Sequence, residues 1–82
     1  MKEIKYGKME LLHAYQKHNL KKSNLVESYS KGVLDSFLEK KSNNILIFCK
    51  DYTIIIVNQK YELVTAWKST PRQYETMCRK NK

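Results

Sequence analysis

The sequence predicts an α+β fold in which two N-terminal helices pack on a three-stranded antiparallel β-meander, followed by a short C-terminal helix. Three observations support this class. Residues 45–67 hold three short apolar runs rich in β-branched and aromatic residues, and only three residues separate one run from the next. The segments on either side have apolar positions at helical spacing. Because a parallel crossover needs a dozen or more residues, the strands are expected to be antiparallel.

The first expected helix runs from Ile4 to about His18. Its apolar residues recur at helical spacing: Met9, Leu11, Leu12 and Tyr15. Gly7 weakens the first turn of this helix. We therefore also consider a start after Gly7, in which the first six residues form an arm that is either pinned to the sheet or mobile.

The second expected helix starts at Asn24 and continues to Leu38. Asn24 and Glu27 have the spacing of a capping box, in which the asparagine accepts from free N–H groups and the glutamate reaches back. A wide apolar stripe is expected to face the sheet: Leu25, Val26, Tyr29, Val33, Leu34, Phe37 and Leu38. Gly32 interrupts the stripe and indicates a kink or a close contact with another backbone.

The three expected strands are Ile45–Cys49, Thr53–Val57 and Tyr61–Trp67. Alternation in the third strand predicts that Leu63, Thr65 and Trp67 share one face. Residues 54–57 are apolar at every position, so we expect helices on one face of the sheet and a partner on the other. The expected core consists of Val33, Leu34, Phe37, Leu46 or Ile47, Ile55, Leu63 and Trp67.

A short helix is expected at the C-terminal end of the chain. Thr70 is a good N-cap, Pro71 suits the first helical position, and Gln73 completes a capping box. The apolar edge of this helix consists of Tyr74, Met77 and Cys78. Basic residues follow near the end of the helix, where they suit its dipole.

Length and composition bound the class of protein. Residues 1–82 are expected to form a single domain with a small core, so a homodimer or a polyanionic partner would add stability. The two cysteines match neither a metal site nor a disulfide framework. No segment resembles a signal peptide or a run that could span a membrane. We therefore expect a cytoplasmic protein with reduced thiols, no cofactor and no membrane partner.

The formal net charge of +8 is concentrated at the two ends of the chain. Residues 1–22 and residues 67–82 each carry a net charge of +4, whereas residues 23–66 are balanced. If the two segments lie side by side, they form one basic face that attracts phosphate. The same composition also fits a solvated, lysine-rich surface, so charge alone does not choose between these interpretations.

Two histidines are the candidates for acid–base chemistry. His13 and His18 are five residues apart, which places their side chains roughly 140° apart on a helix, so we expect only one of them to serve a site. His13 lies beside the apolar stripe, where a histidine is usually structural. His18 lies at the helix end among Lys17, Lys21 and Lys22, which would attract phosphate.

Two short motifs carry a resemblance to a known family. Residues 17–20 (Lys-His-Asn-Leu) lie at the end of the first helix, and residues 62–68 (Glu-Leu-Val-Thr-Ala-Trp-Lys) form the last strand. With helices first and strands after them, the chain resembles the barnase, EndoU, colicin and RelE group of small metal-independent ribonuclease toxins. That group usually has four or more strands and a glycine after the histidine, where this chain indicates three strands and has Asn19.

The resemblance implies cleavage of RNA by its own 2′-hydroxyl, without a metal ion or a cofactor. It implies that His18 acts as base or acid and that Thr65 donates to a phosphate oxygen. It also implies that Lys17 or Lys68 stabilises the charge on phosphorus, and that Trp67 or Tyr61 stacks the neighbouring base. From the basic terminal segments and the aromatic residues, we expect the nucleic acid to be contacted by Lys17, Lys21, Lys22, Tyr61, Trp67 and Arg72.

Two other classes of function stay open. The first is a non-catalytic, phage-like or mobile-element-like protein that binds nucleic acid, or that inhibits a host nucleic-acid-processing or defence protein. The second is a structural or oligomerisation module that uses the second face of the meander as its interface. We expect the partner to be nucleic acid, RNA rather than DNA, or a protein that processes nucleic acid.

Overall fold

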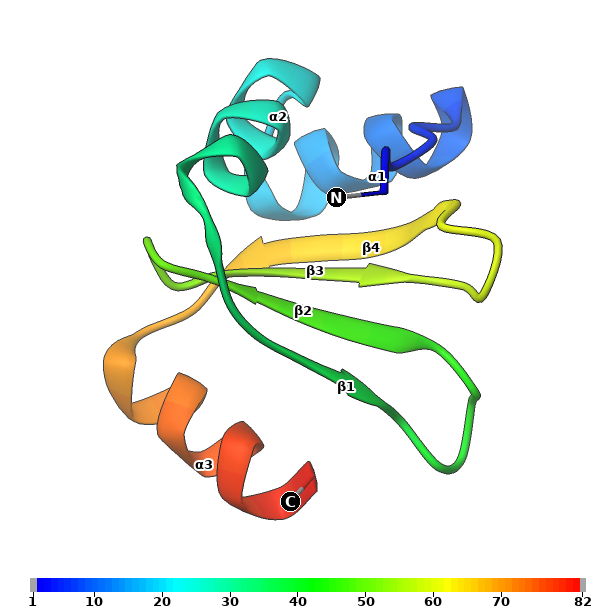
Figure 1. Ribbon diagram of the computed structural model, residues 1–82. Helices are drawn as coiled ribbons and strands as arrows, with labels where there is room; N and C mark the ends of the chain where they lie inside the picture. The colour runs from blue at the N-terminus through cyan, green and yellow to red at the C-terminus, as the bar shows by residue number, and fades with distance from the viewer. Residues whose placement is uncertain (1, 82) are drawn as a thin grey trace.

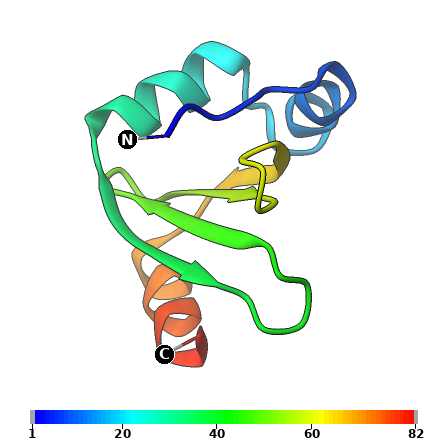
Figure 2. The same ribbon diagram turned by 45° about the vertical axis from the view of Figure 1, so that its right-hand side comes forward.

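The computed structural model describes residues 2–81 and shows an α+β fold around one antiparallel sheet (Figure 1). Its elements, in chain order, are α1 (Lys8–His18), α2 (Lys22–Lys31), β1 (Val33–Leu38), β2 (Ile45–Cys49), β3 (Thr53–Val57), β4 (Leu63–Lys68) and α3 (Pro71–Asn81). The strands pair in the order β1-β2-β3-β4. Helices α1 and α2 cover one face of the sheet, and α3 covers the other, as both views show (Figure 1, Figure 2).

The main difference from the sequence prediction is a fourth strand. The second helix ends at Lys31, and residues 33–38 pair with β2 as the edge strand β1. Gly32 makes this change of direction possible, because its φ of +126° is a backbone conformation that residues with a Cβ rarely adopt. Its carbonyl oxygen accepts from the Lys50 N–H at 3.0 Å. The predicted helix up to Leu38 is therefore wrong, and Gly32 ends α2 instead of interrupting a longer helix.

Helix α2 also begins earlier than the sequence predicts. The N-cap is Lys21, and Asn24 is the third residue of the helix. The Asn24 Oδ1 accepts from the Lys21 N–H at 2.9 Å. A short polar side chain can accept a backbone hydrogen bond at either end of a capping box, so the motif alone does not fix the first helical residue.

The N-terminal residues form an arm that is pinned to the sheet, which is one of the two alternatives for a helix that starts after Gly7. The Lys5 N–H donates to the Tyr61 carbonyl oxygen at 2.8 Å, and the Leu63 N–H donates to the Lys5 carbonyl oxygen at 2.9 Å. These bonds make a short parallel bridge beside the start of β4. Ile4 is buried as a consequence.

A β-bulge in β4 changes which of its residues share a face. Ile56 lies opposite Thr65, but the next residue of β3, Val57, lies opposite Leu63, so Val64 is the extra residue. Leu63 therefore faces α1 and α2, whereas Thr65 and Trp67 face α3. The predicted common face for Leu63, Thr65 and Trp67 is wrong, because uninterrupted alternation does not hold across a bulge.

The larger core lies between the sheet and helices α1 and α2. Its buried side chains are Ile4, Leu25, Ile47, Cys49, Ile55, Val57, Leu63 and Ala66. Helix α1 packs with Ala14, which is fully buried, and with half-buried Leu11. Met9, Leu12 and Tyr15 are exposed, so the predicted apolar stripe of α1 is only in part its packing face.

The smaller core lies under α3. It consists of Leu46, Phe48 and Ile54, with Phe37, Ile56, Trp67, Tyr74, Met77 and Cys78 packed at its margin. The capping box that predicts α3 is confirmed, since the Gln73 N–H donates to the Thr70 Oγ1 at 3.2 Å. Helix α3 thus covers the face for which the sequence predicts a partner. Leu34, which the sequence predicts in the core, is 53% exposed on the edge strand.

The two basic ends of the chain lie on opposite faces of the sheet. Figure 1 shows the N-terminal arm and α1 above the strands and α3 below them. The side-by-side arrangement that would join them into one basic face is therefore not formed. Within the described part of the chain, no helix is long and apolar enough to cross a membrane.

Candidate nucleic-acid site

The end of α1 meets the end of β4, and this contact joins two of the predicted site residues. The centroids of the His18 and Trp67 rings are 6.4 Å apart, with the ring planes tilted by 42°. His18 is exposed to solvent, whereas Trp67 is half-buried. We call this region, formed by His18, Trp67 and the neighbouring Arg72, the α1–β4 corner.

Asn19 determines where α1 ends and therefore where His18 lies. Its φ of 55° and ψ of 35° are left-handed, a conformation that glycine and asparagine adopt more readily than other residues. The Asn19 N–H donates to the Tyr15 carbonyl oxygen at 2.9 Å, and the Leu20 N–H donates to the Ala14 carbonyl oxygen at 3.2 Å. These bonds close the helix and leave His18 as its last residue, beside β4.

Trp67 and Arg72 line a hollow on the α3 side of β4. The hollow has a volume of about 470 Å³ and is also lined by Thr70, Gln73, Thr76 and Met77. Trp67 packs its ring against the smaller core, and Arg72 is exposed in the first turn of α3. An indole ring and a guanidinium group in one hollow can stack a base and pair with a phosphate. The hollow therefore offers two of the contacts that nucleic acid requires.

Lys68 lies on the other side of β4 from this hollow. It lines a second hollow of about 260 Å³, whose walls include Asn19, Ser28, Asp51 and Thr53. Because side chains alternate along β4 from Thr65 to Lys68, Thr65 lies on the face of Trp67 and not on the face of Lys68. Of the three predicted catalytic residues, Thr65 and Lys68 therefore lie on opposite faces of β4, and His18 lies against the Trp67 ring.

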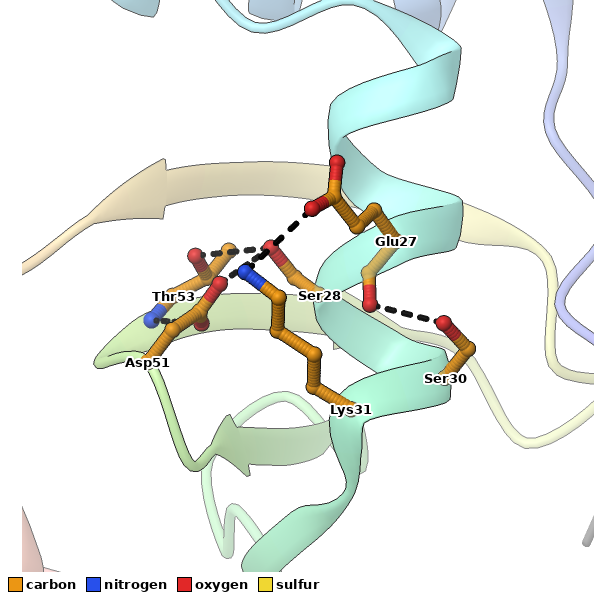
Figure 3. Close-up of polar contacts among 6 residues, drawn as sticks. All are labelled: Glu27, Ser28, Ser30, Lys31, Asp51 and Thr53. Atoms are coloured by element: carbon orange, nitrogen blue, oxygen red, sulfur yellow. Dashed lines mark hydrogen bonds and ion pairs between the residues drawn. The ribbon is translucent and has the colours of Figure 1, made fainter.

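Three polar side chains in the wall of the second hollow form a hydrogen-bonded group (Figure 3). The Ser28 hydroxyl donates to the Asp51 Oδ2 at 2.7 Å and lies 3.1 Å from the Thr53 Oγ1. The Asp51 Oδ1 accepts from the Thr53 N–H at 3.1 Å. Ser28 and Thr53 are buried. The group therefore fixes α2 to the turn between β2 and β3.

These contacts also set the charge of Asp51. Burial by itself would raise the pKa of the Asp51 carboxyl. Hydrogen bonds from Ser28 and from the Thr53 backbone and side chain, together with the charge of Lys68, outweigh burial and lower this pKa below its usual value. Asp51 is therefore an ionised acceptor whose oxygens are occupied by structural bonds, and we assign it a structural role.

None of the three residues of this polar group is among the predicted site residues, although the sequence contains a signal for the group. Ser28 interrupts the apolar stripe of the second helix between Leu25 and Tyr29. Asp51 stands two residues before Thr53 in a turn, which is the spacing at which an aspartate accepts from the backbone. A polar residue on an apolar stripe and a turn aspartate together indicate a buried pair.

The remaining predicted contacts are divided between the two ends of β4. Lys17 and Lys21 are exposed and lie within three residues of His18 in the sequence. Tyr61 lies at the opposite end of β4, beside the N-terminal arm. Lys22 lies at the start of α2, with its Nζ 5.7 Å from the centroid of the Tyr6 ring in the arm. The predicted contact residues thus form two groups rather than one.

Two further features bear on the site: clusters of metal-ligating side chains and similarity to known proteins. Among residues 2–81, no group of three or more histidine, cysteine, aspartate or glutamate side chains lies close enough together to hold a metal ion. Comparison of the chain with known protein families, with curated proteins and with solved structures found no match. The functional proposal therefore rests on the chemistry of the corner.

Proposed function

We propose that this protein acts on RNA at the α1–β4 corner and cleaves it without a metal ion. The observation that carries the proposal is the contact between the His18 imidazole and the Trp67 indole, whose ring centroids are 6.4 Å apart. A proton-transferring group and a base-stacking surface lie side by side there, with Arg72 in the adjoining hollow. This combination fits the needs of metal-independent RNA cleavage.

His18 is the residue to which we assign proton transfer. It takes the proton from the 2′-hydroxyl, whose oxygen attacks the neighbouring phosphorus and displaces the 5′-oxygen, which receives a proton from the imidazolium or from water. Arg72, in the hollow beside Trp67, takes the stabilisation of the negative charge on the phosphate that the sequence predicts for Lys68. Trp67 stacks the adjacent base, and Thr65, on the same face, donates to a phosphate oxygen.

Two structural features support the resemblance to the ribonuclease toxin group. The sequence indicates three strands where that group usually has four or more, and the sheet has four strands. Asn19 stands where a glycine is usual, and its backbone has the left-handed conformation for which glycine is favoured. The strand number therefore fits the group's pattern, and Asn19 has the backbone conformation that a glycine would adopt at that position.

The test is cleavage of a labelled single-stranded RNA by the native chain, His18→Ala and His13→Ala. His13 provides the matched control, because it is also exposed on α1 and its substitution removes the same side chain. We expect the His18 variant to lose at least about 100-fold in rate, as is usual for removal of a general acid or base. The His13 variant should keep native activity. Equal activity of the two variants, or no cleavage by the native chain, would refute the ribonuclease assignment.

Binding of nucleic acid without cleavage is a second candidate function. It is favoured by one observation, that Thr65 and Lys68 lie on opposite faces of β4 and so do not converge on one phosphorus atom. A pure binding protein would yield no RNA product, and its His18→Ala variant would bind RNA as the native chain does. The cleavage assay and a parallel binding measurement therefore separate the two functions.

A further inference from the structure

Three tyrosines lie together beside the start of β4, away from the corner. Tyr6 belongs to the N-terminal arm, Tyr29 to α2 and Tyr61 to the turn before β4, and all three are half-buried against the larger core. Burial, and then the neighbouring Tyr29 hydroxyl, raise the pKa of Tyr6, while burial, and then Tyr61, raise the pKa of Tyr29. Tyr6 and Tyr29 therefore stay uncharged near neutral pH and do not repel phosphate.

Two lysine side chains are held over these rings. The Lys2 Nζ is 5.2 Å from the centroid of Tyr61, and the Lys22 Nζ is 5.7 Å from the centroid of Tyr6. The Tyr29 hydroxyl donates to the Lys2 carbonyl oxygen at 2.6 Å, which fixes the arm in place. Among the side chains that the structure describes, neither lysine forms an ion pair with a carboxylate. Both ammonium groups are therefore able to bind an external anion.

We propose that these residues form a second contact surface for single-stranded RNA, which we call the arm patch: Lys2, Tyr6, Lys22, Tyr29 and Tyr61. The inference rests on the proposed function and extends it by a second subsite for the same substrate. The lysines bind phosphates, and a tyrosine ring stacks a base once its lysine has moved from the ring to a phosphate. A single strand fits this chemistry better than a duplex, because its bases are free to stack on protein rings.

The position of the arm patch suits an RNA strand that also occupies the corner. Lys22 follows His18 after a connector of only three residues, so the patch begins close to the corner. Tyr61 stands six residues before Trp67, which along a strand corresponds to roughly 15–20 Å. A strand of RNA that contacts both ends of β4 must therefore span several nucleotides. A dinucleotide bound at the corner does not reach the far end of the patch.

The hollow next to the arm patch is excluded from the proposed RNA path. It has a volume of about 530 Å³, and its lining includes the carboxylates of Glu10 and Glu62 beside Lys5. The Asn58 Nδ2 donates to the Glu62 Oε1 at 2.8 Å, which holds one of these carboxylates in place. Two carboxylates repel phosphate, so we expect the strand to pass over Lys2 and Lys22 instead.

The test measures binding of fluorescently labelled 2′-O-methyl RNA, which lacks the attacking hydroxyl and therefore reports binding alone. A dinucleotide and a twelve-nucleotide strand are compared on the native chain and on two double variants. Lys2→Gln with Lys22→Gln removes the cations of the patch, and Lys40→Gln with Lys41→Gln removes the same charge from the exposed turn between β1 and β2.

We expect the patch variant to bind the long strand at least about 10-fold more weakly than the native chain. The slope of log K against log salt should fall by about 0.7 for each lost phosphate contact. Binding of the dinucleotide should weaken much less, because a dinucleotide at the corner can contact the patch only at its near end, at Lys22. The turn variant should bind both probes nearly as the native chain does.

Three results would overturn the inference: equal weakening by the two double variants, equal weakening for the two probes, or no binding of the long strand to the native chain. Failure of the proposed function gives a different pattern. If the native chain binds the long strand through the patch but does not cleave unmodified RNA, the proposed cleavage is wrong and the proposed arm patch stands. If cleavage depends on His18 but the patch substitutions do not weaken binding, only the proposed arm patch is wrong.

Discussion

Among single residues, Ser28 shows how a buried polar side chain can be accommodated in a small core. An unpaired hydroxyl within the apolar stripe of α2 would cost free energy. Ser28 instead donates to the ionised Asp51 and lies within hydrogen-bond distance of Thr53. The helix is thereby fixed to the turn between β2 and β3, which orders the wall of the hollow that Lys68 lines.

Replacing Asp51 with asparagine should lower the free energy of unfolding by about 1–2 kcal/mol at neutral pH, because the amide nitrogen cannot accept the bond that one carboxylate oxygen accepts. Urea denaturation measures this change. Glu27→Gln serves as the control, since Glu27 forms an exposed ion pair with Lys31 at 3.3 Å and should contribute less than about 1 kcal/mol. Equal stability of the two variants would contradict a stabilising role for the group.

The same substitution should change the pH dependence of stability. The pKa of Asp51 is lower in the folded chain than in the unfolded chain, so its stabilising contribution is complete above the unfolded value of about 3.9. That contribution is lost as the pH falls through the folded pKa. The difference in stability between the native chain and Asp51→Asn should therefore narrow below about pH 4. A difference that stays constant in acid would contradict this assignment.

Among the elements, the boundary between α2 and β1 depends on Gly32. Replacing Gly32 with alanine should destabilise the fold by roughly 1–3 kcal/mol, because alanine is strained at a φ of +126°. The added Cβ would lie 3.0 Å from the Lys50 Cε, at the end of a flexible side chain, so backbone strain and not a clash supplies most of the cost. Thermal unfolding measures the loss.

Lys31→Ala, one residue earlier on the exposed end of α2, is the control for the glycine substitution and should cost less than about 1 kcal/mol. If the alanine at position 32 is tolerated as well as the alanine at position 31, the positive φ at the boundary between α2 and β1 is not required for the fold.

Helix α3 should be held on the sheet mainly by Tyr74. Its ring meets the Phe48 ring edge-on, with centroids 4.9 Å apart, and the Tyr52 ring at 5.6 Å. Tyr74→Ala should therefore cost about 2–4 kcal/mol of unfolding free energy. Thr76→Ala, on the exposed side of the same helix, should change stability by less than about 0.5 kcal/mol. Similar losses in the two variants would show that α3 is not anchored by its aromatic contacts.

Elements could be predicted from the sequence where local signals act alone. The capping box around Thr70 is local, and the start of α3 agrees with it. The boundary between α2 and β1 is not local, because the spacing of Val33 and Phe37 fits both a helix and a strand, and pairing of residues 33–38 with β2 decides between them. The extra residue Val64 in β4 likewise depends on pairing with β3, so the faces of β4 could not be assigned from alternation.

At the scale of the whole molecule, the sequence indicates side chains whose chemistry suits a nucleic-acid site, but it does not indicate how these side chains are arranged. His18 and Trp67 have distinctive chemistry at the ends of two elements, and the structure brings them together. Tyr61 lies far from them because β4 separates the two positions. The two basic ends lie apart because α3 crosses to the other face of the sheet. The position of α3 depends on which face of the sheet is apolar and not covered by α1 and α2.

The response of the two histidines and the single tryptophan to a ligand tests most directly whether His18 and Trp67 form the site. A 2′-O-methyl dinucleotide is added to the native chain, and the imidazole and indole signals are followed by nuclear magnetic resonance. We predict that the His18 imidazole and the Trp67 indole N–H shift together and saturate with one Kd, while His13, the internal control, stays unchanged. A response of His13 alone, or no response of His18 and Trp67, would contradict the assignment of the corner as the RNA site.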